Sequence, residues 1–91
     1  MGRETRLFKT KEAKTRTEVS NFLRQIAEKI AQGEVILRQG TEELTLQIPE
    51  NLILEIQVED EEKKTKGLQH SLEMEIKWFD NDAASGSLEL G

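Results

Sequence analysis

The chain lacks several residue types, and each absence limits what it can be. Its 91 residues contain no cysteine, which excludes disulfides, thiolate metal sites and thiol catalysis and is typical of a cytoplasmic protein. It has one histidine, one tryptophan, one proline and no tyrosine. No stretch approaches the roughly 20 apolar residues of a membrane helix, and the charged N-terminus has no apolar run of a signal peptide. We therefore expect one small cytoplasmic domain with no membrane contact.

The charges are unevenly divided along the chain. The net charge is −5, but residues 1–38 hold nine Lys and Arg against five Asp and Glu, a net of +4. Residues 39–91 hold four against thirteen, a net of −9. In one small domain such a division indicates halves that face each other, and two separate partners are the alternative.

One amphipathic helix is predicted in the first half. Thr15 is followed three residues later by Glu18, the pattern of a capping box, so the helix should begin near Arg16. Gly33 should end it in the left-handed conformation, which gives a length of about 25 Å. The apolar residues fall at helical spacing in one stripe, made of Val19, Phe22, Leu23, Ile26, Ala27 and Ile30.

After Gly33 the apolar period changes from 3.6 to 2, which is typical of strands. Four alternating segments follow, and a further short strand is expected at 6–11. The four are residues 34–38, 44–48, 52–58 and 68–78. Between them we expect a two-residue turn at Gln39 and Gly40, a turn around Pro49 at 49–51, and a charged loop at 60–67.

The predicted turns imply a register between neighbouring strands. Residues directly opposite each other in an antiparallel pair share a face. The expected pairs are Val35 with Leu44, Ile48 with Leu52, Val58 with Leu68, and Leu54 with Leu72. All of these pairs put the apolar residues on one face of the sheet. A change of one residue in the register would turn the apolar residues of a strand to water.

These elements predict an α+β fold in which one helix packs on one face of an antiparallel sheet. The element order is β-α-β-β-β-β: a four-stranded meander plus the short N-terminal strand, with strand order 2-3-4-5-1. That order would place Lys9 and Lys11 beside Glu73 and Glu75. A parallel βαβ unit, with the first strand beside the second, is the alternative. The domain should span 6–79, with flexible segments at 1–5 and 80–91.

Three stretches follow a pattern seen in one family of small domains. They are EVSNFLRQIAEKIAQG in the helix, GEVILRQGTEELTLQIPENLILEIQVE in the hairpins and LEMEIKW in the last strand. This pattern resembles the Amphi-Trp domain family over residues 6–79, and Trp78 matches the tryptophan that ends the family's amphipathic strand. The resemblance implies the same fold. It supplies no active site, because the family's biochemical role is unknown.

Two adjacent aromatic residues end the last strand. Trp78 continues the inward row of Leu72, Met74 and Ile76, so we expect it to cap one end of the core beneath the helix. The same alternation sends Phe79 outward. Phe79 is therefore the better candidate for a contact with a partner.

No group of residues predicts catalysis. The carboxylates at 55, 59, 73 and 75 fall on the outward face, where nothing in the sequence desolvates them. His70 should lie half-buried at the edge of the core. The six glycines are isolated, so no phosphate-binding loop is present. We predict no catalytic residue, no cofactor and no metal site, and the chain is not expected to be an enzyme.

Two binding surfaces remain. The first is the outer sheet face, with Ile36, Ile53 and Phe79, or an exposed sheet edge, and it predicts a non-catalytic interaction module for an unknown protein partner. The chain itself would be a monomer or a weak homodimer. The alternative is a weak nucleic-acid binder that uses a basic N-terminal arm, made of Lys9, Lys11, Lys14 and Arg16. The acidic remainder of the chain makes nucleic acid the less favoured partner.

Overall fold

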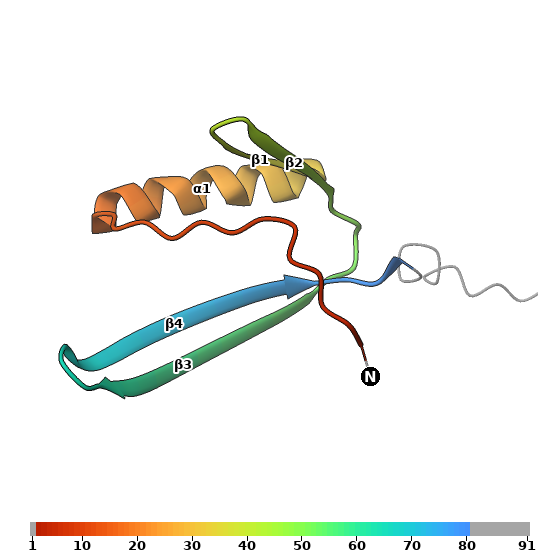
Figure 1. Cartoon of the computed structure of the whole chain (residues 1–91). Coiled ribbons are helices and arrows are strands. Elements are labelled where there is room, and N and C mark those ends of the chain that lie inside the picture. The colour runs from red at the N-terminus through yellow and green to blue at the C-terminus, as the bar shows by residue number, and fades with distance from the viewer. Residues whose placement is uncertain (1, 81–91) are drawn as a thin grey trace, which may run out of the picture. The chain divides into compact units, whose positions relative to one another are not determined.

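The computed structural model describes residues 2–80 and divides the chain into two compact units, Met1–Ile48 and Pro49–Gly91. The first unit contains α1 (Arg16–Gln32), β1 (Glu34–Gln39) and β2 (Glu42–Gln47), and the second contains β3 (Ile53–Lys63) and β4 (Gly67–Lys77) (Figure 1). The predicted α+β class with antiparallel strands is confirmed. The strands form two separate two-stranded sheets, β1-β2 and β3-β4. The predicted flexible tail lies, beyond Asp80, outside the described residues.

The helix follows the prediction at both ends. The Thr15 hydroxyl accepts a hydrogen bond from the Glu18 N–H at 3.1 Å, and the Glu18 carboxylate accepts one from the Thr15 N–H at 2.9 Å, so the capping box is complete. Gly33 lies in the left-handed region at φ 91°, and its N–H reaches the Ile30 carbonyl. Local side-chain chemistry therefore fixes the limits of α1.

The β1-β2 hairpin packs against α1 and supplies the core of the first unit. Val35 lies opposite Leu46, and Leu37 lies opposite Leu44. Val35 is 5% exposed and is the one buried hydrophobic side chain among the described residues. The predicted pairing of Val35 with Leu44 is wrong, because the turn is Gly40-Thr41 and begins one residue later. A glycine with φ 60° at the first central position is what a type II′ turn requires.

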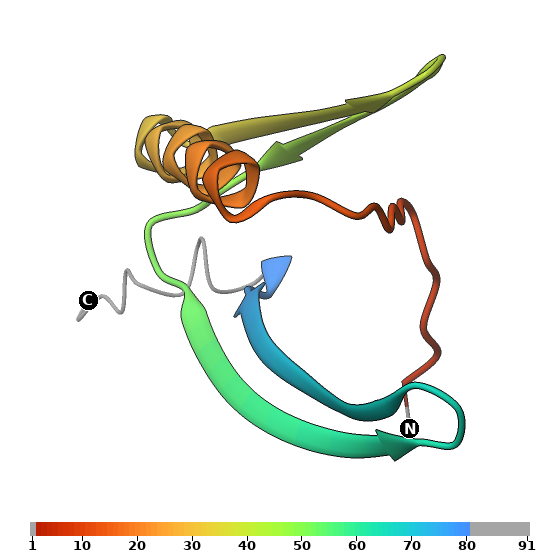
Figure 2. The ribbon, with the colours of Figure 1, turned by 90° about the vertical axis from the view of Figure 1, so that its left-hand side faces the viewer.

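The β3-β4 hairpin is longer than predicted. Eleven residue pairs join the two strands, from Ile53 opposite Lys77 to Lys63 opposite Gly67. Val58 lies opposite Leu72 instead of Leu68, so the predicted register is wrong by four residues, although the faces are kept. Residues 60–63, predicted as a loop, continue β3, and Gly67, at φ 85°, follows a three-residue turn. Figure 2 shows the hairpin curving along its length.

The predicted N-terminal strand is not confirmed. Residues 6–11 form neither helix nor strand, and Phe8 among them is half-buried. The Gln39 side-chain amide donates hydrogen bonds to the Thr10 hydroxyl at 3.0 Å and to the Glu12 carboxylate at 3.5 Å. These side-chain contacts hold the arm near the end of β1 without a backbone ladder. Neither the strand order 2-3-4-5-1 nor the Ile48–Leu52 pairing is confirmed, because β2 and β3 belong to different sheets.

Candidate interaction surface

The β3-β4 hairpin carries an apolar row on one of its faces. Cross-strand pairs build it, since Leu54 lies opposite Ile76, Ile56 opposite Met74 and Val58 opposite Leu72. The apolar row consists of Leu54, Ile56, Val58, Leu72, Met74 and Ile76, and Leu68 lies on the same face beyond the Asp60–His70 pair. These side chains are between 37% and 71% exposed, and neither strand contains a buried residue. A contiguous apolar surface of this kind indicates an interaction site.

The opposite face of the hairpin is acidic. Glu55 lies directly opposite Glu75, and two such carboxylates repel each other. The Lys77 ammonium relieves this repulsion: it donates a hydrogen bond to Glu55 at 2.7 Å and lies 3.8 Å from Glu75. This hydrogen bond lowers the pKa of Glu55 and raises the pKa of Lys77. The sequence prediction missed this role of Lys77, because the contact depends on the cross-strand register.

Polar and charged side chains make contacts at the end of the hairpin near its turn. His70 Nδ1 lies 2.7 Å from Asp60 Oδ1, and Lys63 Nζ lies 3.2 Å from Glu61 Oε1. The side chain of His70 is 71% exposed, so its predicted half-burial is wrong. Exposed pairs of this kind contribute at most about 1 kcal/mol each. Both contacts involve residues of the charged segment that continues β3.

Both outer edges of the hairpin lack a neighbouring strand in the described part of the chain. β3 pairs only with β4 there, and β4 only with β3. A strand edge presents a row of backbone N–H and C=O groups that can pair with another strand. The hairpin therefore offers an apolar row, an acidic face and two edges.

The residues predicted for the outer sheet face are all exposed. Ile36 is 40% exposed in β1, Ile53 is 46% exposed at the start of β3, and Phe79 is 64% exposed beyond β4. Ile36 belongs to the first unit, whereas Ile53 and Phe79 belong to the second. Trp78 is half-buried, so its side chain is more exposed than that of a fully buried core residue.

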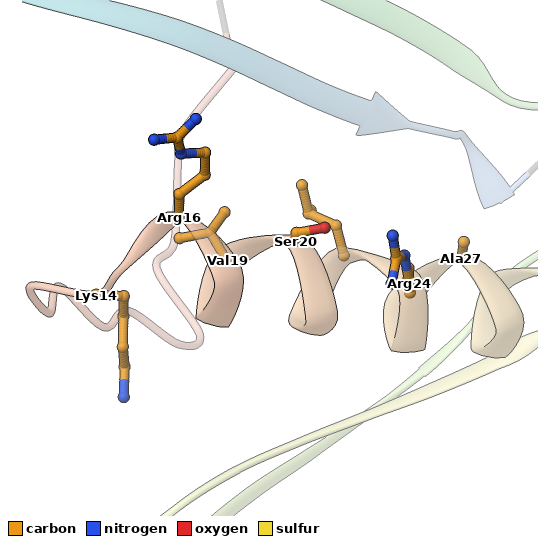
Figure 3. A pocket seen from close by; sticks show the side chains of 7 residues that line it. Lys14, Arg16, Val19, Ser20, Arg24 and Ala27 are labelled. Atoms are coloured by element: carbon orange, nitrogen blue, oxygen red, sulfur yellow. The ribbon is translucent and has the colours of Figure 1, made fainter.

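The basic arm extends along the start of α1. Lys9, Lys11, Lys14 and Arg16 are exposed, and Lys14 Nζ lies 3.2 Å from Glu12 Oε1. That contact raises the pKa of Lys14. A depression of about 580 Å³ lies along α1. Figure 3 shows Arg16, Ser20 and Ala27, three of the side chains that line it, on one side of the helix. Arg24, which the sequence prediction missed, also lines the depression, and the spacing of four residues from Arg16 to Ser20 to Arg24 is the signal that could have found it.

A second groove lies within the first unit. Its volume is about 590 Å³, and the arm, α1 and β1 all contribute to it. Phe8, Phe22 and Ile36 give it apolar walls, while Gln39 lies near one end with its hydrogen bond to Thr10. No polar side chain aimed into it is buried, so it has no built ligand site.

Residues 2–80 contain neither a candidate metal site nor a helix that could cross a membrane. No group of three or more His, Asp or Glu side chains in this range could hold a metal ion. Its one helix is too short and too polar to cross a membrane.

The family model described as the Amphi-Trp domain matches residues 1–91, which is the whole chain. No curated protein and no solved structure matches the chain.

Proposed function

The chain belongs to the Amphi-Trp domain family, and from its geometry we propose that it is a non-catalytic interaction module that binds a protein partner through the β3-β4 hairpin. The partner adds a strand to an outer edge of the hairpin. Side chains of the apolar row then contact the partner next to the new strand. We further infer that the module acts in the cytoplasm, for which the cysteine-free composition is the support.

One observation carries the proposal: eleven residue pairs join β3 to β4, and no third strand joins them in the described chain. A lone two-stranded hairpin is at best marginally stable in water, and three or more strands with an apolar face are needed for independent stability. The apolar row is largely exposed. An added strand would supply both the missing backbone hydrogen bonds and apolar contacts.

A retention experiment from native lysate tests this function. The full chain serves as bait, and a synthetic peptide that copies Gly67–Lys77 is added in excess as competitor, with a scrambled peptide as control. We expect the bait to retain a protein that is released by the peptide copying Gly67–Lys77 and is not released by the scrambled peptide. Retention that is indifferent to both peptides would contradict binding at the β4 edge.

A second bait distinguishes binding at the sheet edge from binding at the outer sheet face. Ile53→Ser with Phe79→Ser removes the two exposed apolar side chains of the second unit that the sequence assigned to that face. Under the proposal this bait retains the same partner. Loss of the partner only with this bait would move the contact to the outer face.

A second function has one observation in its favour. Arg16 and Arg24 line the same depression on α1, which gives two cations for backbone phosphates, whereas Lys14 is paired with Glu12. A titration with DNA and with RNA at low and moderate salt tests it. Binding that weakens with salt and is lost when Arg16 and Arg24 are replaced by Gln would favour nucleic acid over the protein partner.

A further inference from the structure

We propose that the outer edge of β4 pairs with the same edge of a second copy of this chain, antiparallel and centred on Leu72. The two hairpins then form one four-stranded sheet in the order β3-β4-β4-β3. This inference rests on the proposed use of a sheet edge and names its occupant. It uses residues of the second unit alone.

The β4 sequence is complementary to itself in this arrangement. With Leu72 facing Leu72 of the second copy, Leu68 lies opposite Ile76 and His70 lies opposite Met74, so the apolar residues of the two copies share one face with the two His70 side chains. On the other face Gln69 lies opposite Glu75, and Ser71 lies opposite Glu73. Each carboxylate then faces a hydrogen-bond donor, and no two carboxylates face each other.

Other registers of β4 are poorer. A shift that centres the pair on Glu73 would place two Glu73 side chains directly opposite each other. Centring it on Ser71 would leave Ile76 and Lys77 beyond the facing strand. Any odd shift would set the apolar row against the polar face. The centring on Leu72 alone pairs the whole strand.

The edge of β3 is unsuited to the same pairing. β3 carries five carboxylates and one lysine, a net of −4, whereas β4 carries two carboxylates and one lysine, a net of −1. Centred on Val58, two β3 strands would put Glu55 opposite Glu61 and Leu54 opposite Glu62. Charged residues on an edge are a common device against unwanted pairing. The charge distribution thus selects β4.

The chain's own N-terminal arm is the competing occupant of the β4 edge. In the described residues the hydrogen bonds of the arm go to Gln39 at the end of β1, within the first unit. This leaves β4 without a neighbour on its outer side.

Disulfide trapping tests the pairing, and the absence of native cysteine removes any background. Residues opposite each other across an antiparallel pair have Cα atoms about 4.5 to 5.5 Å apart, which a disulfide spans. We expect mild oxidation to convert most of the Leu72→Cys chain into a covalent dimer. Val58→Cys is the matched control, because Val58 lies opposite Leu72 on the same face of the same hairpin but belongs to β3.

A second set of variants tests the register. Gln69→Cys mixed with Glu75→Cys should give a covalent heterodimer, while neither variant alone should link to itself. Equal linking of Leu72→Cys and Val58→Cys would indicate hairpins stacked face to face and would overturn the proposal. An intramolecular disulfide in a Lys9→Cys, Glu73→Cys double variant would show the arm on the β4 edge and would overturn it as well.

Sedimentation of the wild-type chain separates this inference from the proposed function. We expect a concentration-dependent dimer, with far-UV circular dichroism confirming that each cysteine variant is folded. A chain that stays monomeric, yet still retains a lysate partner that the β4 peptide releases, would end the inference and leave the interaction module standing. A chain that forms the dimer but retains no protein from the lysate would support this inference and contradict the proposed binding of a lysate partner.

Discussion

At the residue scale, two valines on the two hairpins differ sharply in burial. Val35 is 5% exposed against α1, whereas Val58 is 71% exposed in the apolar row. Val35→Ala should lower the free energy of unfolding by about 2 kcal/mol, because it removes buried methyl groups and leaves a cavity. Val58→Ala should cost much less at concentrations where the chain is monomeric. Chemical denaturation of both variants measures this, and equal losses would show that the apolar row is covered.

The helix cap gives a second prediction at this scale. Thr15→Ala removes the acceptor of the Glu18 N–H and should cost about 1 kcal/mol of stability. Thr17→Ala is the matched control, since Thr17 lies within the first turn and takes no part in the capping box. Thermal unfolding followed by circular dichroism compares them. If Thr17→Ala cost as much as Thr15→Ala, the cap would not be the cause.

Glu18 also makes a testable contribution to pH dependence. The hydrogen bond from the Thr15 N–H lowers the pKa of Glu18 below its ordinary value of 4.5. A lowered pKa in the folded chain means that this stabilisation is present above pH 4.5 and is lost as pH falls through the folded value. Glu18→Gln keeps the capping geometry but cannot titrate. The stability difference between wild type and Glu18→Gln should therefore shrink below pH 4.5, and a difference independent of pH would contradict this.

At the element scale, the β3-β4 turn depends on one backbone conformation. Gly67 has φ 85°, a region that side chains with a Cβ atom avoid, although nothing lies within 4 Å of the Cβ position. Gly67→Ala should therefore cost about 1–2 kcal/mol through backbone strain alone. Gly2→Ala, which also has open space, should change nothing. Denaturation of the two variants checks this, and an unchanged Gly67→Ala would mean that the turn has another conformation.

The helix could be predicted closely from the sequence, and the strand register could not. Thr15, Glu18 and Gly33 act on the chain within a few residues of themselves, so their effect is readable locally. A shift of four residues between β3 and β4 leaves every apolar side chain on the same face, so alternation alone could not detect it. The charged end of β3 was missed because its partners, such as His70 for Asp60, lie across the hairpin.

The surface residues could be predicted as exposed, but their grouping could not. Phe79 follows the alternation of β4 outward and is 64% exposed. The depression on α1 joins Arg24 to Lys14 and Arg16, and this grouping needs the helix and the arm together. Side chains that meet across elements depend on packing, which the sequence pattern does not contain.

At the scale of the whole molecule, the two units differ in charge. Met1–Ile48 holds nine Lys and Arg against seven Asp and Glu, a net of +2, and Pro49–Gly91 holds four against eleven, a net of −7. Two second units therefore repel each other when their β4 edges meet. Salt screens this repulsion, so added salt should strengthen self-association.

Salt dependence thus separates the two proposed kinds of partner. Binding of nucleic acid releases counterions and weakens as salt increases, which is the opposite trend. Sedimentation of the chain alone and titration with nucleic acid, both over the same salt series, measure the two trends. Self-association that declines with salt would contradict pairing between the acidic units.

The most direct test of the central claim is amide hydrogen exchange along β4. In a two-stranded hairpin the backbone amides of successive β4 residues point alternately toward β3 and away from it, so only every second amide is protected. A strand added to the outer edge protects the others. At high chain concentration we predict slow exchange at consecutive residues from Leu68 to Ile76, reverting to alternate protection on dilution. Alternate protection at every concentration would contradict the account.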